Sequence, residues 1–164
     1  MNFAHTHHRQ TYDLLGEMLA ELFEGIVEEE GHFYVRYGST VIELAVEPHG
    51  EEDTSVVIMA YCVQDAELDD DLALGLLELN HSLAFGAFSV VGNDIFFSHN
   101  LYGRSLDRGN LLNAVTAVAD ISDDYDDRIV AKFGGQRALD RIRGTGGRRR
   151  RSQQAAARSE TPPS

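Results

Sequence analysis

Three histidines crowd the start of the chain, and histidine is a common metal ligand and proton carrier in proteins. His5, His7 and His8 all fall within residues 5–8. A structural metal site needs a fourth ligand and an outer shell that orients the ligands, and the neighbouring sequence offers neither. We therefore predict a solvated, frayed start and no metal site. His81, near the end of a predicted helix, and His99, on a predicted strand, are expected to cap or pack.

The single cysteine is the only thiol that could act as a nucleophile. Cys62 lies in an apolar run, and aliphatic neighbours raise a thiol pKa and make the side chain inert. One cysteine also excludes an internal disulfide and a cysteine-based zinc cluster. The sequence contains no serine elbow, phosphate-binding loop or dinucleotide fingerprint. We predict no catalytic residue, no cofactor and no enzymatic activity.

Carboxylates are plentiful, and five of them cluster within two helical turns. Like-charged pairs four residues apart on a helix cost about 0.2–0.5 kcal/mol each, which an exposed face tolerates. Their spacing does not match a calcium loop. We predict a solvated helix face, while a small-ligand or metal-binding domain built from carboxylates with His81 or His99 stays open as an alternative. The cluster consists of Asp120, Asp123, Asp124, Asp126 and Asp127.

Charge divides the chain into an acidic body and a basic tail. Residues 1–135 carry six basic and 25 acidic side chains, a net charge of −19, and residues 136–164 carry eight and two, a net charge of +6. The tail is rich in Gly, Arg and Ser and cannot bury enough apolar surface to offset its ordering entropy, so we predict that it is disordered.

Four consecutive arginines in the tail permit three interpretations. They are Arg148, Arg149, Arg150 and Arg151. The run could bind an anionic partner, either nucleic acid or lipid, and the protein would then be regulatory. It could fold back on the acidic body, or it could have no role. The negative charge of the body repels phosphate backbones, which disfavours a nucleic-acid partner.

The periodicity of apolar residues predicts an α+β domain over residues 1–135. No run of 18 apolar residues and no signal peptide is present, so we expect a cytoplasmic protein with no membrane span. The element order is α-β-β-β-α-β-β-α, an antiparallel sheet packed by helices. The predicted elements are a helix over Arg9–Val27, strands over Phe33–Tyr37, Thr40–Glu47 and Ser55–Val63, a helix over 69–83, two strands within Ala87–Tyr102, and a helix from Ser105 or Asp107 to Phe133. The strand over Ser55–Val63 is apolar on both faces, which predicts that it is central in the sheet.

Strand alternation places several large side chains on the outward face of the sheet. If Phe33 and its alternates face the core, Tyr34 and Arg36 face out, and by the same rule Phe96 and Tyr102 face out. Aromatic residues on an outward face indicate a docking surface for a helix, a second subunit or a peptide. The alternative is that the last helix or a partner protomer covers them.

One short passage resembles a known family. Between a helix and a hairpin the sequence reads LNHSLAFGAF, and the YbjN-like family carries a similar passage. That family looks like the type III secretion chaperones. The resemblance implies a secretion-chaperone-like fold and a non-enzymatic homodimer that offers apolar patches or an open sheet edge to a protein or peptide partner. The basic tail is not part of the family pattern. The matching residues are Leu79, Asn80, Leu83, Phe85, Gly86 and Phe88.

Overall fold

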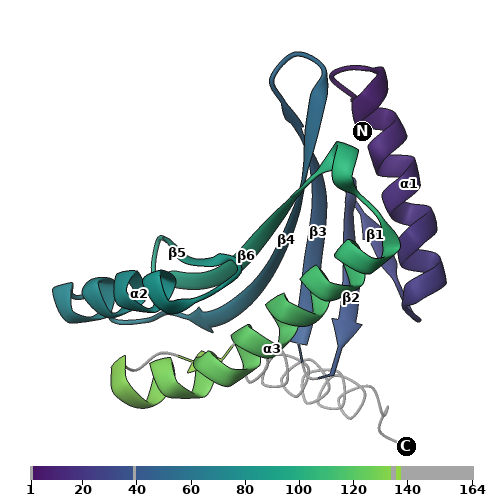
Figure 1. Cartoon of the computed structure of the whole chain (residues 1–164). Helices are drawn as coiled ribbons and strands as arrows, with labels where there is room; N and C mark the ends of the chain where they lie inside the picture. The colour runs from purple at the N-terminus through teal and green to yellow at the C-terminus, as the bar shows by residue number, and fades with distance from the viewer. Residues whose placement is uncertain (1, 39, 134–135, 138–164) are drawn as a thin grey trace, which may run out of the picture.

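The computed structural model describes residues 2–38, 40–133 and 136–137. It is an α+β fold of three helices and a six-stranded antiparallel sheet (Figure 1). The helices are α1 (Thr6–Leu22), α2 (Asp70–Ser82) and α3 (Arg108–Phe133), with a 3-10 turn η1 (Gly103–Ser105). The strands are β1 (Val27–Glu29), β2 (His32–Tyr37), β3 (Thr40–His49), β4 (Asp53–Gln64), β5 (Ala87–Val91) and β6 (Asp94–Tyr102), and a two-residue β7 (Gln136–Arg137) pairs with β4.

The strands lie in the order β1-β2-β3-β4-β6-β5. Alternate strand residues such as Val35, Ile58 and Phe97 are fully buried, because α1, α2 and α3 bring their apolar stripes to that face. Leu15 and Leu111 supply the centres of two of those stripes. The core is therefore one continuous layer between the sheet and the helices, and the predicted order of helices and long strands is confirmed.

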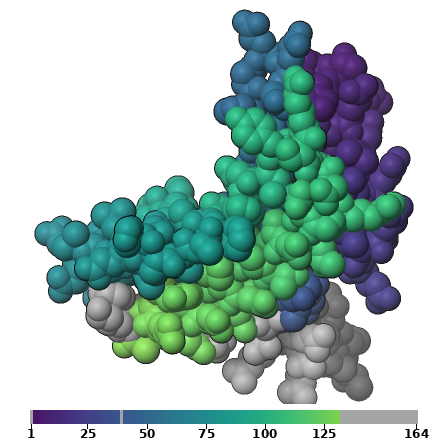
Figure 2. Space-filling view, in the orientation of Figure 1, coloured from purple at the N-terminus to yellow at the C-terminus, as the bar shows by residue number. Residues whose placement is uncertain are grey.

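Two arms diverge in the space-filling view. One arm carries the β3–β4 hairpin and α1, and the other carries α2 lying along the C-terminal half of α3 (Figure 2). The sheet is strongly twisted between them (Figure 1). A register shift between Tyr61 and Val63 interrupts the β4–β6 pairing, and the extra residue there lets both Cys62 and Val63 be buried.

The first predicted helix is too long. The observed helix α1 ends at Leu22, and the backbone of Phe23 is already extended. The apolar spacing continues at helical intervals beyond this point, but Val27–Glu29 form a strand with β2 instead, and Glu30 turns the chain at a φ of 52°. Pairing with a neighbouring strand therefore overrides the helical pattern.

Candidate functional site

The face of the sheet opposite the helices is the first candidate surface. Tyr34 lies opposite Glu43, Glu43 opposite Met59, and Met59 opposite Ser98, so these side chains form one row across four strands. All four are partly buried, and no described helix lies over this row. Tyr61, on the same strand and face as Met59, is 40% exposed. An uncovered row with aromatic and thioether side chains can hold another chain.

Carboxylates surround the tyrosine of this row. Partial burial raises the pKa of the Tyr34 hydroxyl, and the charges of Glu43, Glu29 and Glu30 raise it further. Glu43 is itself paired with His32, at 2.6 Å between the carboxylate oxygen and Nδ1. The surface thus combines aromatic and thioether side chains with the Glu43 carboxylate inside the row and further carboxylates beside it, and at neutral pH Tyr34 offers a neutral hydroxyl.

The structure separates the four predicted site residues into two groups. Tyr34 and Arg36 lie side by side on β2, and Phe96 lies on the same face, against the Tyr61 ring at 4.2 Å. Phe96 lies on the outward face, as predicted, but is only 6% exposed, because the Tyr61 ring packs against it. Tyr102 is exposed but lies six residues further along β6, about 20 Å away.

Sequence reasoning missed the centre of this surface. Met59 and Tyr61 belong to β4, which was predicted to be a central strand apolar on both faces. The sequence does carry a pattern that points to this surface, because large side chains alternate at positions 57, 59 and 61. The pattern becomes informative only when the structure shows that no described helix covers this face of the sheet.

A second surface is formed by the outer side of α2 and the neighbouring β5. Leu74 and Leu77 of α2 and Phe85 and Val91 beside or on β5 are each 59–68% exposed. This concentration of large exposed apolar side chains on one arm is typical of an interaction surface.

The passage that carried the family resemblance joins α2 to β5. The Asn80 side chain accepts from the Phe88 N–H at 2.7 Å and donates to the Phe88 carbonyl at 3.0 Å. It therefore occupies both main-chain groups of one residue on an edge strand. Gly86 has a φ of +69°, and an added Cβ there would lie 2.5 Å from the Ser98 carbonyl oxygen, so only glycine fits.

The chain matches a known protein family over most of its length. The chain matches the family model described as T3SS (YopN, CesT) and YbjN peptide-binding chaperone 1 over residues 5–141. The protein belongs to this family of peptide-binding chaperones. The match includes the whole described fold, which confirms the resemblance predicted from the α2–β5 passage. No curated protein matches the chain.

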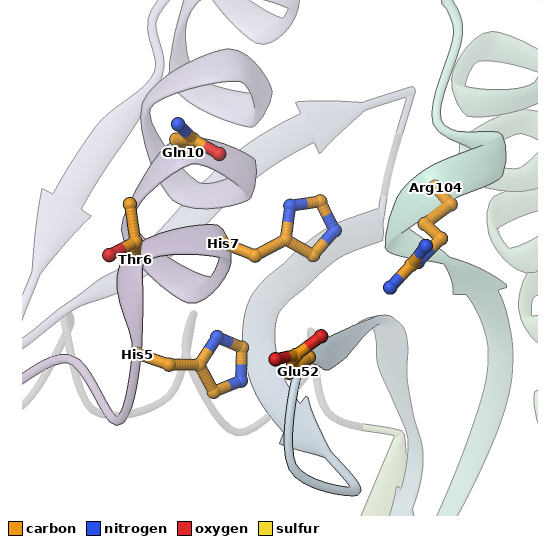
Figure 3. Close-up of a pocket in the computed structure, with 6 residues that line it drawn as sticks. All are labelled: His5, Thr6, His7, Gln10, Glu52 and Arg104. Carbon is orange, nitrogen blue, oxygen red and sulfur yellow. The ribbon is translucent and has the colours of Figure 1, made fainter.

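A polar pocket of about 440 Å³ lies at the start of α1, on the far arm of this chaperone-family fold (Figure 3). His5 and His7 point from α1 toward Glu52 on the β3–β4 loop and Arg104 on η1. Asp53 accepts from Arg104 Nε at 3.0 Å and lies 3.8 Å from His7 Nε2. The Thr54 backbone N–H, then Arg104 and His7, keep the pKa of Asp53 below its usual value.

The hydrogen bonds of this pocket do not favour a metal. His5 Nδ1 accepts from the His8 N–H as the N-cap of α1, so neutral His5 carries its proton on Nε2 and offers no lone pair to the pocket. In the part of the chain that the structure describes, no group of three or more metal-ligating side chains occurs.

The prediction of a frayed, solvated start is wrong. His8 is only 4% exposed, with Nε2 3.0 Å from the Val46 carbonyl oxygen and Nδ1 accepting from Ala4 N–H. Thr11 extends this contact through its hydroxyl, 3.0 Å from the Thr54 hydroxyl. These polar bonds fasten α1 to β3 and β4.

The remaining reactive side chains lie in the core. Burial raises the pKa of the Cys62 thiol to about 12, as the aliphatic neighbours predicted. Burial also lowers the pKa of His99, whose ring packs at 5.9 Å from Phe85. Asp126 is buried on the sheet side of α3, so the predicted carboxylate cluster does not lie wholly on a solvated face.

Two further predictions have different outcomes. Arg148, Arg149, Arg150 and Arg151 lie outside the described residues, so the roles proposed for them stay predictions, as does disorder of the tail. No helix in the described ranges has the length and apolar content needed to cross a membrane.

Proposed function

We propose that this protein is a non-enzymatic, homodimeric module of the cytoplasm that binds a partner polypeptide in an extended form. The observation that carries the proposal is the outer face of the sheet around Tyr34, Met59 and Tyr61, over which no described helix lies. Membership of a peptide-binding chaperone family gives the class of ligand. Burial of the partner's apolar side chains against this face would supply most of the binding free energy.

The charge of the body supports a binding role in two ways. A net charge of −19 over residues 1–135 keeps a protein soluble while it exposes apolar surface. The carboxylates of Glu29, Glu30 and Glu43 next to Tyr34 favour basic segments of a partner and disfavour acidic ones. Selection among partners therefore follows charge as well as apolar content.

The α2–β5 surface supports the homodimer. Leu74 and Leu77 lie on the side of α2 that faces away from the core, and Phe85 and Val91 are exposed in the segment that follows α2. A surface of this composition can bury itself against a second copy through a two-fold axis. Leu77→Glu should then convert a dimer into a monomer in light scattering coupled to gel filtration. Leu112→Glu, at a partly exposed leucine on α3, is the matched control and should leave the dimer intact.

Photo-crosslinking tests the binding surface. A benzoylphenylalanine replacing Tyr61 should form covalent adducts with a polypeptide in native-host cells, and the same residue at Leu112 on the helical side should not. A second substitution, Met59→Glu, should abolish the adducts because it replaces the apolar side chain between Glu43 and Ser98 with a second carboxylate beside Glu43. Equal adducts from both positions, or adducts that survive Met59→Glu, would remove the outer face from consideration.

A further inference from the structure

A groove of about 320 Å³ runs between α2 and α3 on the helical side of the molecule. Leu72, Leu76 and Ile129 form its buried floor, and partly buried Leu79 and Tyr125 form its walls. The two helices lie side by side along one arm, with the groove between them (Figure 2). This volume is in the range of natural ligand pockets and can hold one large side chain.

A glycine in the middle of α2 keeps the groove open. Gly75 lines it, five residues into a 13-residue helix, where glycine costs about 1 kcal/mol of stability relative to alanine. Its backbone is in the helix, so no turn requires it here. Glycine differs from other residues at this position only because it has no side chain. The missing side chain leaves space between Leu72 and Leu79.

The aromatic wall is held in a fixed orientation. The Tyr125 ring packs edge-on against Phe88 at 5.5 Å, and the Arg128 guanidinium lies over it at 5.2 Å. An aromatic side chain fixed on two sides presents a firm surface to a ligand and loses little entropy on binding.

One carboxylate, Glu78, and one cation, Arg128, line the groove, and two further carboxylates, Asp71 and Asp124, flank it at helical spacing. Asp71 and Glu78 lie four residues before and three residues after Gly75, so all three share one side of α2. Asp124 is exposed on α3 next to Tyr125, and Arg128 is the cation that lines the groove. Leu74 and Leu77 point to the opposite side of α2, so the proposed dimer surface and this groove do not overlap.

We propose that the groove between α2 and α3 receives a large apolar side chain of a partner polypeptide whose flanking residues are basic. This proposal rests on the proposed function only in taking the ligand to be a polypeptide. The groove is a second contact, on the helical side, and it anchors one residue while the rim carboxylates select lysine or arginine on either side. Arg128, already over the Tyr125 ring, orients the wall.

The absence of tryptophan from the chain gives a clean assay. The probe is a lysine-rich peptide of about a dozen residues with one central tryptophan, and its fluorescence is titrated with the full-length protein. We expect a blue shift as the indole leaves water, with binding that weakens as salt is raised. A peptide with glutamate in place of every lysine should bind at least tenfold more weakly.

Gly75→Leu is the decisive variant, because leucine fills the groove while improving the helix. We expect at least a tenfold loss of affinity for the lysine peptide with unchanged or higher thermal stability. Ala73→Leu adds the same side chain at an exposed position of α2 and should leave affinity unchanged.

Three outcomes would overturn the proposal: no binding of the lysine peptide, equal binding of the glutamate peptide, or undiminished binding by Gly75→Leu. Crosslinking at Tyr61 is independent of all three, so the outer-face proposal can survive each of them. Conversely, loss of the Tyr61 adducts with a normal response of Gly75→Leu would leave the groove as the site.

Discussion

Replacing Asn80 by alanine should destabilise the protein measurably, although the side chain is polar and partly exposed. Its amide makes two hydrogen bonds to one residue, accepting from Phe88 N–H at 2.7 Å and donating to Phe88 C=O at 3.0 Å. Each such bond contributes about 0.5–1.5 kcal/mol net, so the pair contributes about 1–3 kcal/mol. Alanine improves helix propensity at this interior position of α2 by up to about 0.7 kcal/mol. We therefore expect a net loss of about 1–2 kcal/mol.

The assay is urea unfolding, monitored by far-ultraviolet circular dichroism. Unfolding midpoints are compared directly only if the variants show the same dependence of the unfolding free energy on urea concentration. Asn113→Ala is the matched control, because Asn113 is exposed within α3. That variant gains helix propensity and should be unchanged or slightly more stable. The two alanine substitutions are thus predicted to differ in sign.

A third variant separates the two hydrogen bonds. Asn80→Asp keeps an acceptor for Phe88 N–H but places an ionised oxygen against the Phe88 carbonyl, so at neutral pH it should be less stable than Asn80→Ala. If Asn80→Ala proves as stable as Asn113→Ala, the two hydrogen bonds to Phe88 do not hold α2 to β5.

Three other predictions concern the fold. Gly86→Ala should cost more than about 2 kcal/mol by urea unfolding, because the position combines a φ of +69° with a close approach of Ser98 O; a loss below 0.5 kcal/mol would contradict the strain. The pKa of Asp53 is lowered in the folded state, so the ionised side chain stabilises the fold at pH values above the pKa of Asp53 in the unfolded chain. This contribution is lost as the pH falls through the folded-state pKa. Asp53→Asn should flatten the fall in stability on acidification, and an unchanged pH profile would count against stabilisation of the carboxylate by the Thr54 N–H and Arg104. Cys62, with a pKa raised to about 12, should react with iodoacetamide only on unfolding, and fast labelling of the native protein would show that it is accessible.

Much of the fold could be predicted because its long elements carry strong periodic patterns. The continuous apolar run in Ser55–Val63 predicted a central strand, which β4 is, with β3 on one side and β6 on the other. The first helix boundary failed because β1 has three residues, too few for a pattern, while the apolar spacing before it is helical. A contact distant in sequence decided that boundary.

The predicted sites failed where polar residues were assigned to solvent by type. His8 precedes Tyr12 and Leu15 by four and seven residues, so the helix places it on the buried face of α1. Asp126 lies likewise between buried Ser122 and Ile129 on α3. Position on the helix was the better guide in both cases. The groove beside Gly75 was out of reach, since it depends on how two helices pack.

The two margins of the sheet limit how the molecule can polymerise. At one margin Asn80 already engages the main-chain groups of Phe88 that an added strand would need. At the other margin β1 is three residues long and two of its residues are glutamates. Neither edge strand presents a long, uncharged row of free backbone groups. Edge-to-edge pairing of copies of this chain into fibrils is therefore disfavoured, although the outer face of the sheet can still bind another polypeptide.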